Sequence, residues 1–216
     1  MKDLDEKFVI ENEMLLSFYL LKIRDCMDDF VFSYEVLRKN SEQKTSNLTL
    51  DKVWDSVQLL CRSCAQTANI FAPNCRGDIT EKNPKRKKEK KEFSKKRGEA
   101  LRSLFLLNFS QNNWVTMRDA RNRFIHFDED VDIWFFESDK TASREIVWRA
   151  LEGQKHDRSH CVIQRYDREN GILQNFGTDY LFSELKNLMQ SISAKLNFAD
   201  VNLSKIAPNR TRVIIS

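Results

Sequence analysis

The chain has 216 residues, of which 41% are hydrophobic and 31% charged, a composition typical of a globular protein with one substantial core. Five glycines and three prolines are few for this length and disfavour all-β folds, which need many turns. The net charge of +4 is unevenly placed, because residues 81–97 hold ten Lys or Arg against three Glu, a net of +7, which leaves −3 for the remainder.

The sequence contains no signal for a membrane. No apolar run approaches the roughly 20 residues that a spanning helix needs. The first ten residues, MKDLDEKFVI, carry acidic side chains where a signal peptide has a basic flank and an apolar core. We therefore expect a cytoplasmic protein, and its five cysteines, an odd number, fit reduced thiols better than disulfides.

Two long helices are predicted at the N-terminal end. Residues 3–39 contain neither Gly nor Pro. Their apolar side chains recur at a first spacing of seven residues and then every three or four residues. This predicts one long helix with a near-heptad buried stripe of Val9, Leu16, Leu20, Ile23, Met27, Phe30, Tyr34 and Leu37. Further apolar residues widen the expected buried face: Phe8, Leu15, Phe18, Tyr19, Phe32 and Val36. A second helix is expected from a cap at 47–49 to about Phe71, where Ala72-Pro73-Asn74 ends it.

The rest of the chain mixes helices with a β segment. Residues 74–97 read as a solvated connection that turns helical near Glu92, and a third helix is expected from Gly98 to about Phe109. Ser110 is the expected N-cap of a fourth helix over 111–127. Residues 131–138 are strand-like, 146–151 are ambiguous, and 160–176 predict a β-hairpin with a Gly-containing turn. A last helix is expected from about Thr178.

The predicted fold class is therefore mainly α. We expect a single domain over 1–216, built as a bundle of about five helices. Residues 81–97 would form a basic linker or loop, and about 131–176 a β-containing insertion before the last helix. Trp54, Trp114, Trp134 and Trp148 are expected to anchor the core or an interface.

One stretch, RNRFIHFDED at 121–130, carries side chains suited to chemistry. Arg121, Asn122 and His126 lie within six residues at the predicted end of the fourth helix. At about 100° per residue, Asn122 lies about 40° from His126, and Arg118 continues that face. Arg121 lies about 140° from His126, nearer the core-facing stripe of Met117, Ala120, Phe124 and Phe127.

These side chains suit the chemistry of an RNA phosphodiester. A guanidinium matches phosphate oxygens, an imidazole with a pKa of about 6.5 can give or accept a proton, and a carboxamide can orient either. RNA supplies its own nucleophile, the 2′-hydroxyl, so we expect neither a metal nor another cofactor. The alternative is an exposed polar helix face making ordinary i,i+4 contacts, in which Asp119 pairs with Arg118 or Arg123.

The same residues carry a resemblance to a known family. RNRFIHFDEDVDIWF resembles the signature of HEPN domains, in which Arg and His, very often as Arg-Asn-x-x-x-His, end a late helix of a small bundle. The resemblance is specific over about residues 114–135. It implies a metal-independent endoribonuclease, used as a toxin or phage-defence effector, with an antitoxin or regulatory partner. In that case Arg121 would bind the scissile phosphate, Asn122 would position it, and His126 would be the acid and base.

The resemblance also implies a homodimer with two motifs facing one cleft. In-line transfer needs a base and an acid on opposite sides of phosphorus, and two copies of His126 would supply both. Asp128 stands where toxin members of the family often carry tyrosine, so no tyrosine role is carried over. Two alternatives remain open: a non-catalytic HEPN-like module that binds RNA, nucleotide or a protein partner, and an oligomeric scaffold built on the first helix.

Two further features bear on partners. The predicted RNA contacts are basic side chains near the motif and in the basic run: Arg118, Arg123, Lys87, Lys88, Lys90 and Lys91. The same run also resembles a nuclear-import signal or an ordinary solvated loop. Cys61 and Cys64, spaced as a CxxC, have no second CxxC, and the distant candidates are Cys75, His156 and His160-Cys161. Buried thiols are therefore expected in place of zinc.

Overall fold

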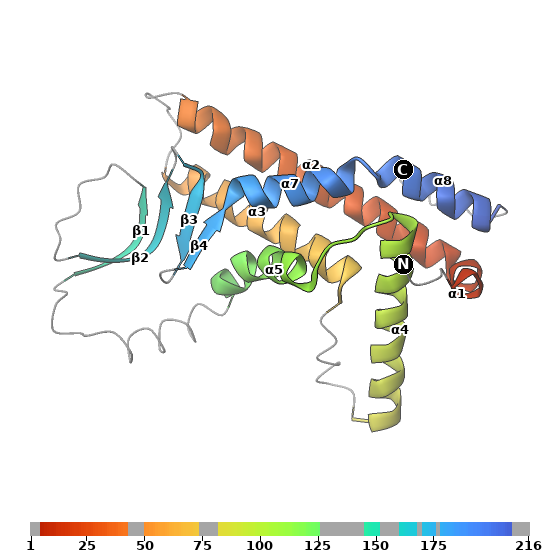
Figure 1. Ribbon diagram of the computed structural model, residues 1–216. Helices are drawn as coiled ribbons and strands as arrows, with labels where there is room; N and C mark the ends of the chain where they lie inside the picture. Colours follow the sequence, from red (N-terminus) through yellow and green to blue (C-terminus); the bar gives the residue numbers. More distant parts are fainter. Residues whose placement is uncertain are drawn as a thin grey trace. The chain divides into compact units, whose positions relative to one another are not determined.

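The computed structural model describes residues 5–42, 50–73, 82–125, 145–151, 160–167, 170–175 and 178–208. Of residues 40–42, 50, 123–125, 145–151, 160–165 and 175 it describes the backbone alone. The described chain is mainly α-helical, as predicted (Figure 1). Its elements are α1 (Glu6–Glu11), α2 (Glu13–Glu42), α3 (Leu50–Phe71), α4 (Pro84–Leu104), α5 (Gln111–Ile125), β1 (Glu145–Leu151), β2 (His160–Asp167), β3 (Ile172–Asn175), β4 (Thr178–Leu181), α7 (Phe182–Ser193) and α8 (Leu196–Ile206).

The chain forms two compact units, each made of segments distant in sequence. Unit 1 comprises Met1–Asp29, Gln66–Val115 and Leu188–Ser216. Unit 2 comprises Phe30–Ala65 and Thr116–Asn187. Unit 1 therefore contains α1, α4 and α8, and unit 2 contains the sheet and most of α5.

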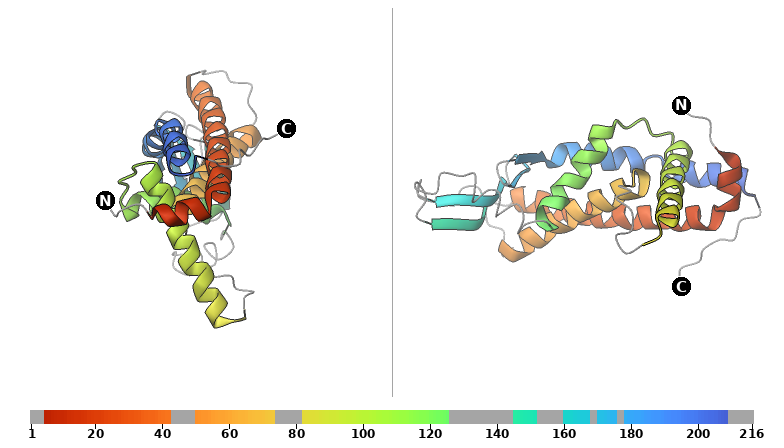
Figure 2. Two further views of the ribbon diagram at one scale, coloured as in Figure 1. Left: turned by 90° about the vertical axis from the view of Figure 1, so that its right-hand side faces the viewer. Right: turned by 90° about the horizontal axis from the view of Figure 1, so that it is seen from below.

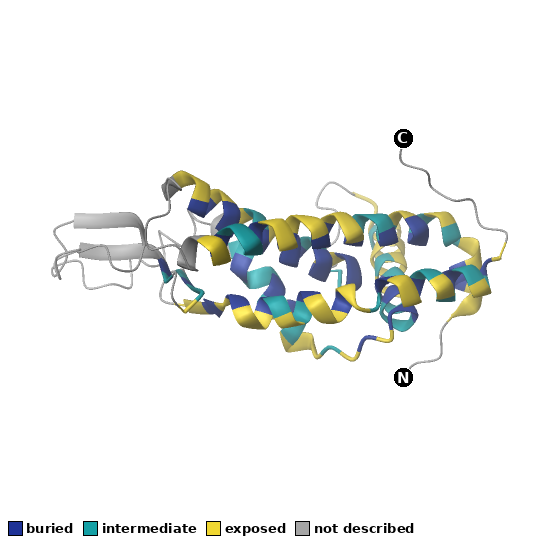
Figure 3. Cartoon of the chain, turned by 90° about the horizontal axis from the view of Figure 1, so that it is seen from above, coloured by how far each residue is buried: buried dark blue, intermediate teal, exposed yellow. Residues whose placement is uncertain are grey.

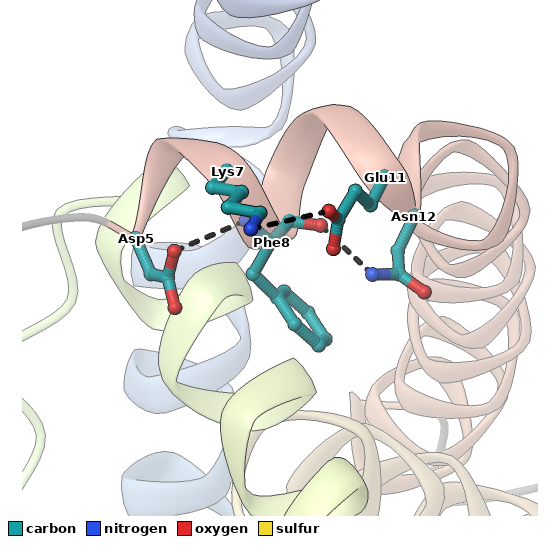
Figure 4. A network of polar contacts seen from close by, with 5 residues as sticks. All are labelled: Asp5, Lys7, Phe8, Glu11 and Asn12. Atoms are coloured by element: carbon teal, nitrogen blue, oxygen red, sulfur yellow. Dashed lines mark hydrogen bonds and ion pairs between the residues drawn. The ribbon is translucent and has the colours of Figure 1, made fainter.

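The prediction of a single helix over residues 3–39 is wrong in one respect, because the helix is interrupted at Asn12 and α1 and α2 are separate. The carboxylate of Asp5 caps α1 by accepting a hydrogen bond from the Phe8 amide (3.0 Å; Figure 4). At the other end, the Asn12 side chain donates to the Phe8 carbonyl (2.9 Å). The Asn12 carbonyl in turn accepts from the Leu16 amide (3.0 Å). An asparagine side chain that bonds locally to the backbone competes with helix continuation, which explains the break.

The predicted buried stripe is confirmed, and its expected extra width is confirmed in part. Seven of the eight stripe residues are buried, Val9 in α1 and six in α2, and Tyr34 is half-buried. Buried and exposed residues follow one another along the helices (Figure 3). Phe18 and Phe32, however, are 53% and 64% exposed. Each lies two residues beyond a buried stripe position and therefore about 200° around the helix. Of the other four residues expected to widen the face, Phe8 of α1 is buried and Leu15, Tyr19 and Val36 are half-buried, so the face is wider than the stripe but does not include Phe18 and Phe32.

Helix α4 replaces the basic linker predicted over 81–97. It begins at Pro84, whose missing amide hydrogen costs nothing in a first helical turn. The Asn83 side chain caps it by accepting from the amides of Lys85 (3.0 Å) and Arg86 (3.4 Å). The helix passes through Gly98, predicted to be a helix start, and ends at Leu104, five residues before the predicted end.

The β segment of unit 2 is a four-stranded sheet in the order β1-β2-β3-β4. Strand β1 is parallel to β2, and β2 pairs antiparallel with β3, as the predicted hairpin requires. Gly171, with φ +62°, occupies the turn in the left-handed region that favours glycine. Strand β4 was predicted to be the start of the last helix. Its Tyr180 is buried opposite Leu173 of β3, and this cross-strand packing outweighs the helical pattern.

Aromatic residues anchor the core of unit 1. The ring of Phe71 packs edge-on against Phe105 (4.9 Å between centroids) and stacks with Trp114 (5.5 Å). Trp54, near the start of α3 and in unit 2, is also buried. Both described tryptophan side chains are therefore core anchors, as predicted. Trp134 lies outside the described residues, and only the backbone of Trp148 is described.

Candidate functional site

Helix α5 carries the part of the Arg-Asn-x-x-x-His motif that the structure describes. Arg121 and Asn122 are both half-buried in its last turns. His126 lies outside the described residues, and of Arg123 the backbone alone is described. The structure therefore places the phosphate-binding and orienting residues of the predicted site and leaves the position of the predicted acid-base residue untested.

Local sequence explains where α5 begins and which face it buries. Ser110 is the predicted N-cap, and its hydroxyl accepts from the Asn113 amide (3.3 Å). The side-chain oxygen of Asn113 in turn accepts hydrogen bonds from the Ser110 amide (2.9 Å) and from the Ser110 hydroxyl (2.8 Å). Met117 and Ala120, two members of the predicted stripe, are fully buried. Their burial leaves Arg121 at the border of the core, as predicted.

The electrostatic surroundings of Arg121 are unusual for an arginine. Burial lowers the pKa of its guanidinium, and the positive charge of Arg62 lowers that pKa further. Arg62 is an exposed residue of α3 in the same unit. Among the described residues, no carboxylate offsets these two effects on Arg121. Within the described part of the chain, the charge of Arg62 thus adds to the positive potential at Arg121, and positive potential is what an anion prefers.

Arg118 lies one turn earlier and differs from Arg121 in its neighbours. Burial lowers the pKa of Arg118, while the carboxylate of Asp119 opposes that change by raising the pKa. Asp119 thus acts on a neighbouring arginine, which agrees with the structural role expected for it. Asp119 therefore partly offsets the charge of Arg118, whereas the charge that acts on Arg121 is that of a second cation, Arg62.

The four lysines predicted to contact RNA belong to another part of the structure. Lys87, Lys88, Lys90 and Lys91 lie on the N-terminal half of α4, in unit 1. Lys87 is half-buried and the other three are exposed. They stand on a helix, where the sequence predicted a loop.

The cysteines of α3 are buried, as predicted. Cys61 and Cys64 are buried thiols in the core, and burial raises the pKa of Cys61 to about 12. A thiol with so high a pKa is protonated at neutral pH and is a poor nucleophile. Cys75 and His156 lie outside the described residues, and of His160 and Cys161 only the backbone is described. Within the described ranges, no three His, Cys, Asp or Glu residues gather as a metal site would require.

Sequence reasoning missed Arg62. It stands between Cys61 and Ser63 on the solvent side of α3, far from the motif in the sequence. The helical pattern of α3 indicates its exposure but not the helix that it faces.

No described helix has the length and apolar composition needed to cross a membrane.

Comparisons with known proteins add no identification. No protein-family model, no curated protein and no solved structure matches this chain.

Proposed function

We propose that this protein is a metal-independent endoribonuclease of the HEPN type that acts as a homodimer. The observation that supports the proposal is the position of Arg121, a motif residue that is half-buried on α5 and whose pKa is lowered by burial and by the positive charge of Arg62. A scissile phosphate is the anion that this pair would bind. The motif supplies the remaining groups, Asn122 on the same helix and His126 four residues further along the sequence.

The reaction requires one base and one acid. One copy of His126, as neutral imidazole, removes the proton of the 2′-hydroxyl, and the freed oxygen attacks the adjacent phosphorus. The bond from phosphorus to the 5′-oxygen breaks as a second imidazole, protonated, gives its proton to that oxygen. The products are a 2′,3′-cyclic phosphate and a 5′-hydroxyl. Arg121 and Arg62 would stabilise the extra negative charge on the phosphorane, and Asn122 would orient the phosphate.

The proposal is tested by RNA cleavage with purified protein in EDTA. His126→Ala should reduce the cleavage rate by about 100-fold or more, the usual contribution of general acid-base catalysis. Arg121→Lys keeps the charge but loses the planar fork of donors, and we expect a clear loss of activity. Arg24→Lys alters an exposed arginine of α2 and serves as the matched control, with an expected rate equal to wild type.

The second candidate is a non-catalytic module that binds RNA or nucleotide through the same cations. The Arg62–Arg121 pair favours anion binding whether or not a bond is cut. Binding that depends on Arg121 and Arg62, with no cleavage by wild type, would support this candidate against the nuclease. Binding and cleavage that are both indifferent to Arg121 would contradict both.

A further inference from the structure

The N-terminal part of α4 is a second concentration of positive charge. Residues 84–97, which we call the basic arm, hold nine Lys or Arg against two Glu. The arm spans about 20 Å at 1.5 Å per residue. Even with both glutamates fully paired, a net charge of +7 remains on this short helix.

The arm is attached to unit 1 at its C-terminal end. Gly98, Ala100, Leu101 and Leu104, which follow it in α4, are all buried. Arg97 marks the junction, because its guanidinium lies over the ring of Tyr19 (4.5 Å to the centroid) and donates to the Tyr19 hydroxyl (2.8 Å). The arm then extends away from the other helices of unit 1 (Figures 1 and 2).

Three lysines form a continuous row on the arm. Lys87, Lys91 and Lys95 recur at every fourth position and therefore lie about 6 Å apart along one face. Lys88 lies beside them. The exposed lysines Lys88, Lys91 and Lys95 lie about 140° to 160° around the helix from Phe93, which packs against Phe8. Within the arm, these lysines thus face away from the side that packs.

This arrangement is unfavourable for the isolated helix. Like charges four residues apart repel each other by a few tenths of a kcal/mol per pair. Cations in the first turns also oppose the helix dipole, whose positive end is the N-terminus. The Asn83 cap and Pro84 favour the helix in spite of these effects. A polyanion along the row would remove both costs.

We propose that the basic arm binds the phosphate backbone of RNA. An anionic membrane is the poorer partner, since a surface helix needs an apolar face, and the one large apolar residue of the arm, Phe93, packs against Phe8 (5.5 Å between ring centroids). A protein partner needs an apolar interface core, which the arm also lacks. The choice of RNA over DNA rests on the proposed nuclease function, whereas the charge argument stands without it.

The arm would supply affinity that is independent of base sequence. Each phosphate contact on a single strand adds about 0.7 to the slope of log affinity against log salt concentration. Removing three lysines should therefore lower that slope by about 2. At 0.1 M salt the same loss weakens binding by roughly 100-fold.

The experiment measures binding of a fluorescent 2′-O-methyl oligouridylate of 20 nucleotides by the full chain. This RNA analogue lacks the nucleophile, so the measurement is valid whether or not the protein cleaves RNA. The test variant is Lys88→Gln/Lys91→Gln/Lys95→Gln, because glutamine matches lysine in helix propensity. The charge-matched control removes three exposed cations elsewhere, Arg24→Gln/Lys39→Gln/Lys205→Gln. A variant with arginine at the three arm positions restores the charge, and circular dichroism checks that each variant is folded.

The expected result is a loss of roughly 100-fold and a lower salt slope for the glutamine variant alone, with affinity retained by the arginine variant. A loss equal to that of the control would overturn the proposal. Tighter binding to a 20-base-pair DNA duplex, or to phosphatidylserine vesicles, would overturn the choice of RNA. If the arm variant loses binding while wild type shows no cleavage of natural RNA, the arm is supported and the nuclease function fails.

Discussion

The close contact between α4 and the end of α3 predicts an inverted response to substitution of Gly98. In an ordinary helix interior, Gly→Ala stabilises by about 1 kcal/mol. At Gly98 a Cβ atom would lie 2.6 Å from the Phe71 carbonyl oxygen and 2.7 Å from the Pro73 ring. The first of these neighbours is backbone, so relief requires a shift of α4 or of the last turn of α3.

Such a shift disturbs more than one contact. The Phe71 carbonyl also accepts a hydrogen bond from Arg102, and the Phe71 ring packs against Phe105 and Trp114. Overpacking of this kind costs about 1 to 3 kcal/mol. After subtraction of the helix-propensity gain, we expect Gly98→Ala to destabilise by up to about 2 kcal/mol.

Urea unfolding measures this change directly, and a thermal melt should show a midpoint lower by a few degrees. Ser94→Ala, a half-buried position on the same helix, is the matched control and should be neutral or slightly stabilising. An increase of about 1 kcal/mol for Gly98→Ala would show that α4 does not approach Phe71 as described, and the reasoning would be wrong.

Two further predictions concern buried and junction residues. Because burial raises the pKa of Cys61 to about 12 from its ordinary 9.0, the unfolded chain ionises this thiol first as pH rises. The free energy of unfolding should therefore be constant below about pH 9 and fall by about 2 kcal/mol by pH 10.5. Urea unfolding at several pH values should show a correspondingly smaller fall for Cys61→Ala. Equal falls for wild type and variant would count against the burial of Cys61. Arg97→Lys gives up the guanidinium contacts with Tyr19 and the Asn69 carbonyl and should cost about 1 to 2 kcal/mol, whereas Arg24→Lys should cost nothing measurable. Equal stability of these two arginine variants would contradict the junction described for α4.

Periodicity predicted the buried faces of α2 and α5. The buried stripe of α2 and the stripe of Met117 and Ala120 follow from spacing, because a helix must bury one face. The cap at Ser110 follows from residue type, because a serine hydroxyl can accept a hydrogen bond from an amide of the first helical turn. The hairpin turn at Gly171 was similarly visible, since few residues other than glycine favour its φ of +62°.

The errors come from local chemistry that spacing does not contain. Pro84 was read as part of a connection, but at the first helical position it favours helix. Asn12 breaks a segment without Gly or Pro by bonding to the Phe8 carbonyl. Arg62 shows a different limit: its effect on Arg121 depends on which helices meet, and composition does not encode that. The position of His126 lies outside the described residues, so its role remains a prediction.

The central claim is that Arg121, Asn122 and His126 direct the 2′-hydroxyl of RNA at the neighbouring phosphate. An oligodeoxynucleotide that contains one ribonucleotide tests this most directly, with EDTA present and products identified by mass spectrometry. The account predicts one cut, 3′ to the ribose, with a 2′,3′-cyclic phosphate end, and no cut for the 2′-O-methyl analogue or for His126→Ala. Cleavage at deoxynucleotides, or a product ending in a 3′-hydroxyl, would contradict it.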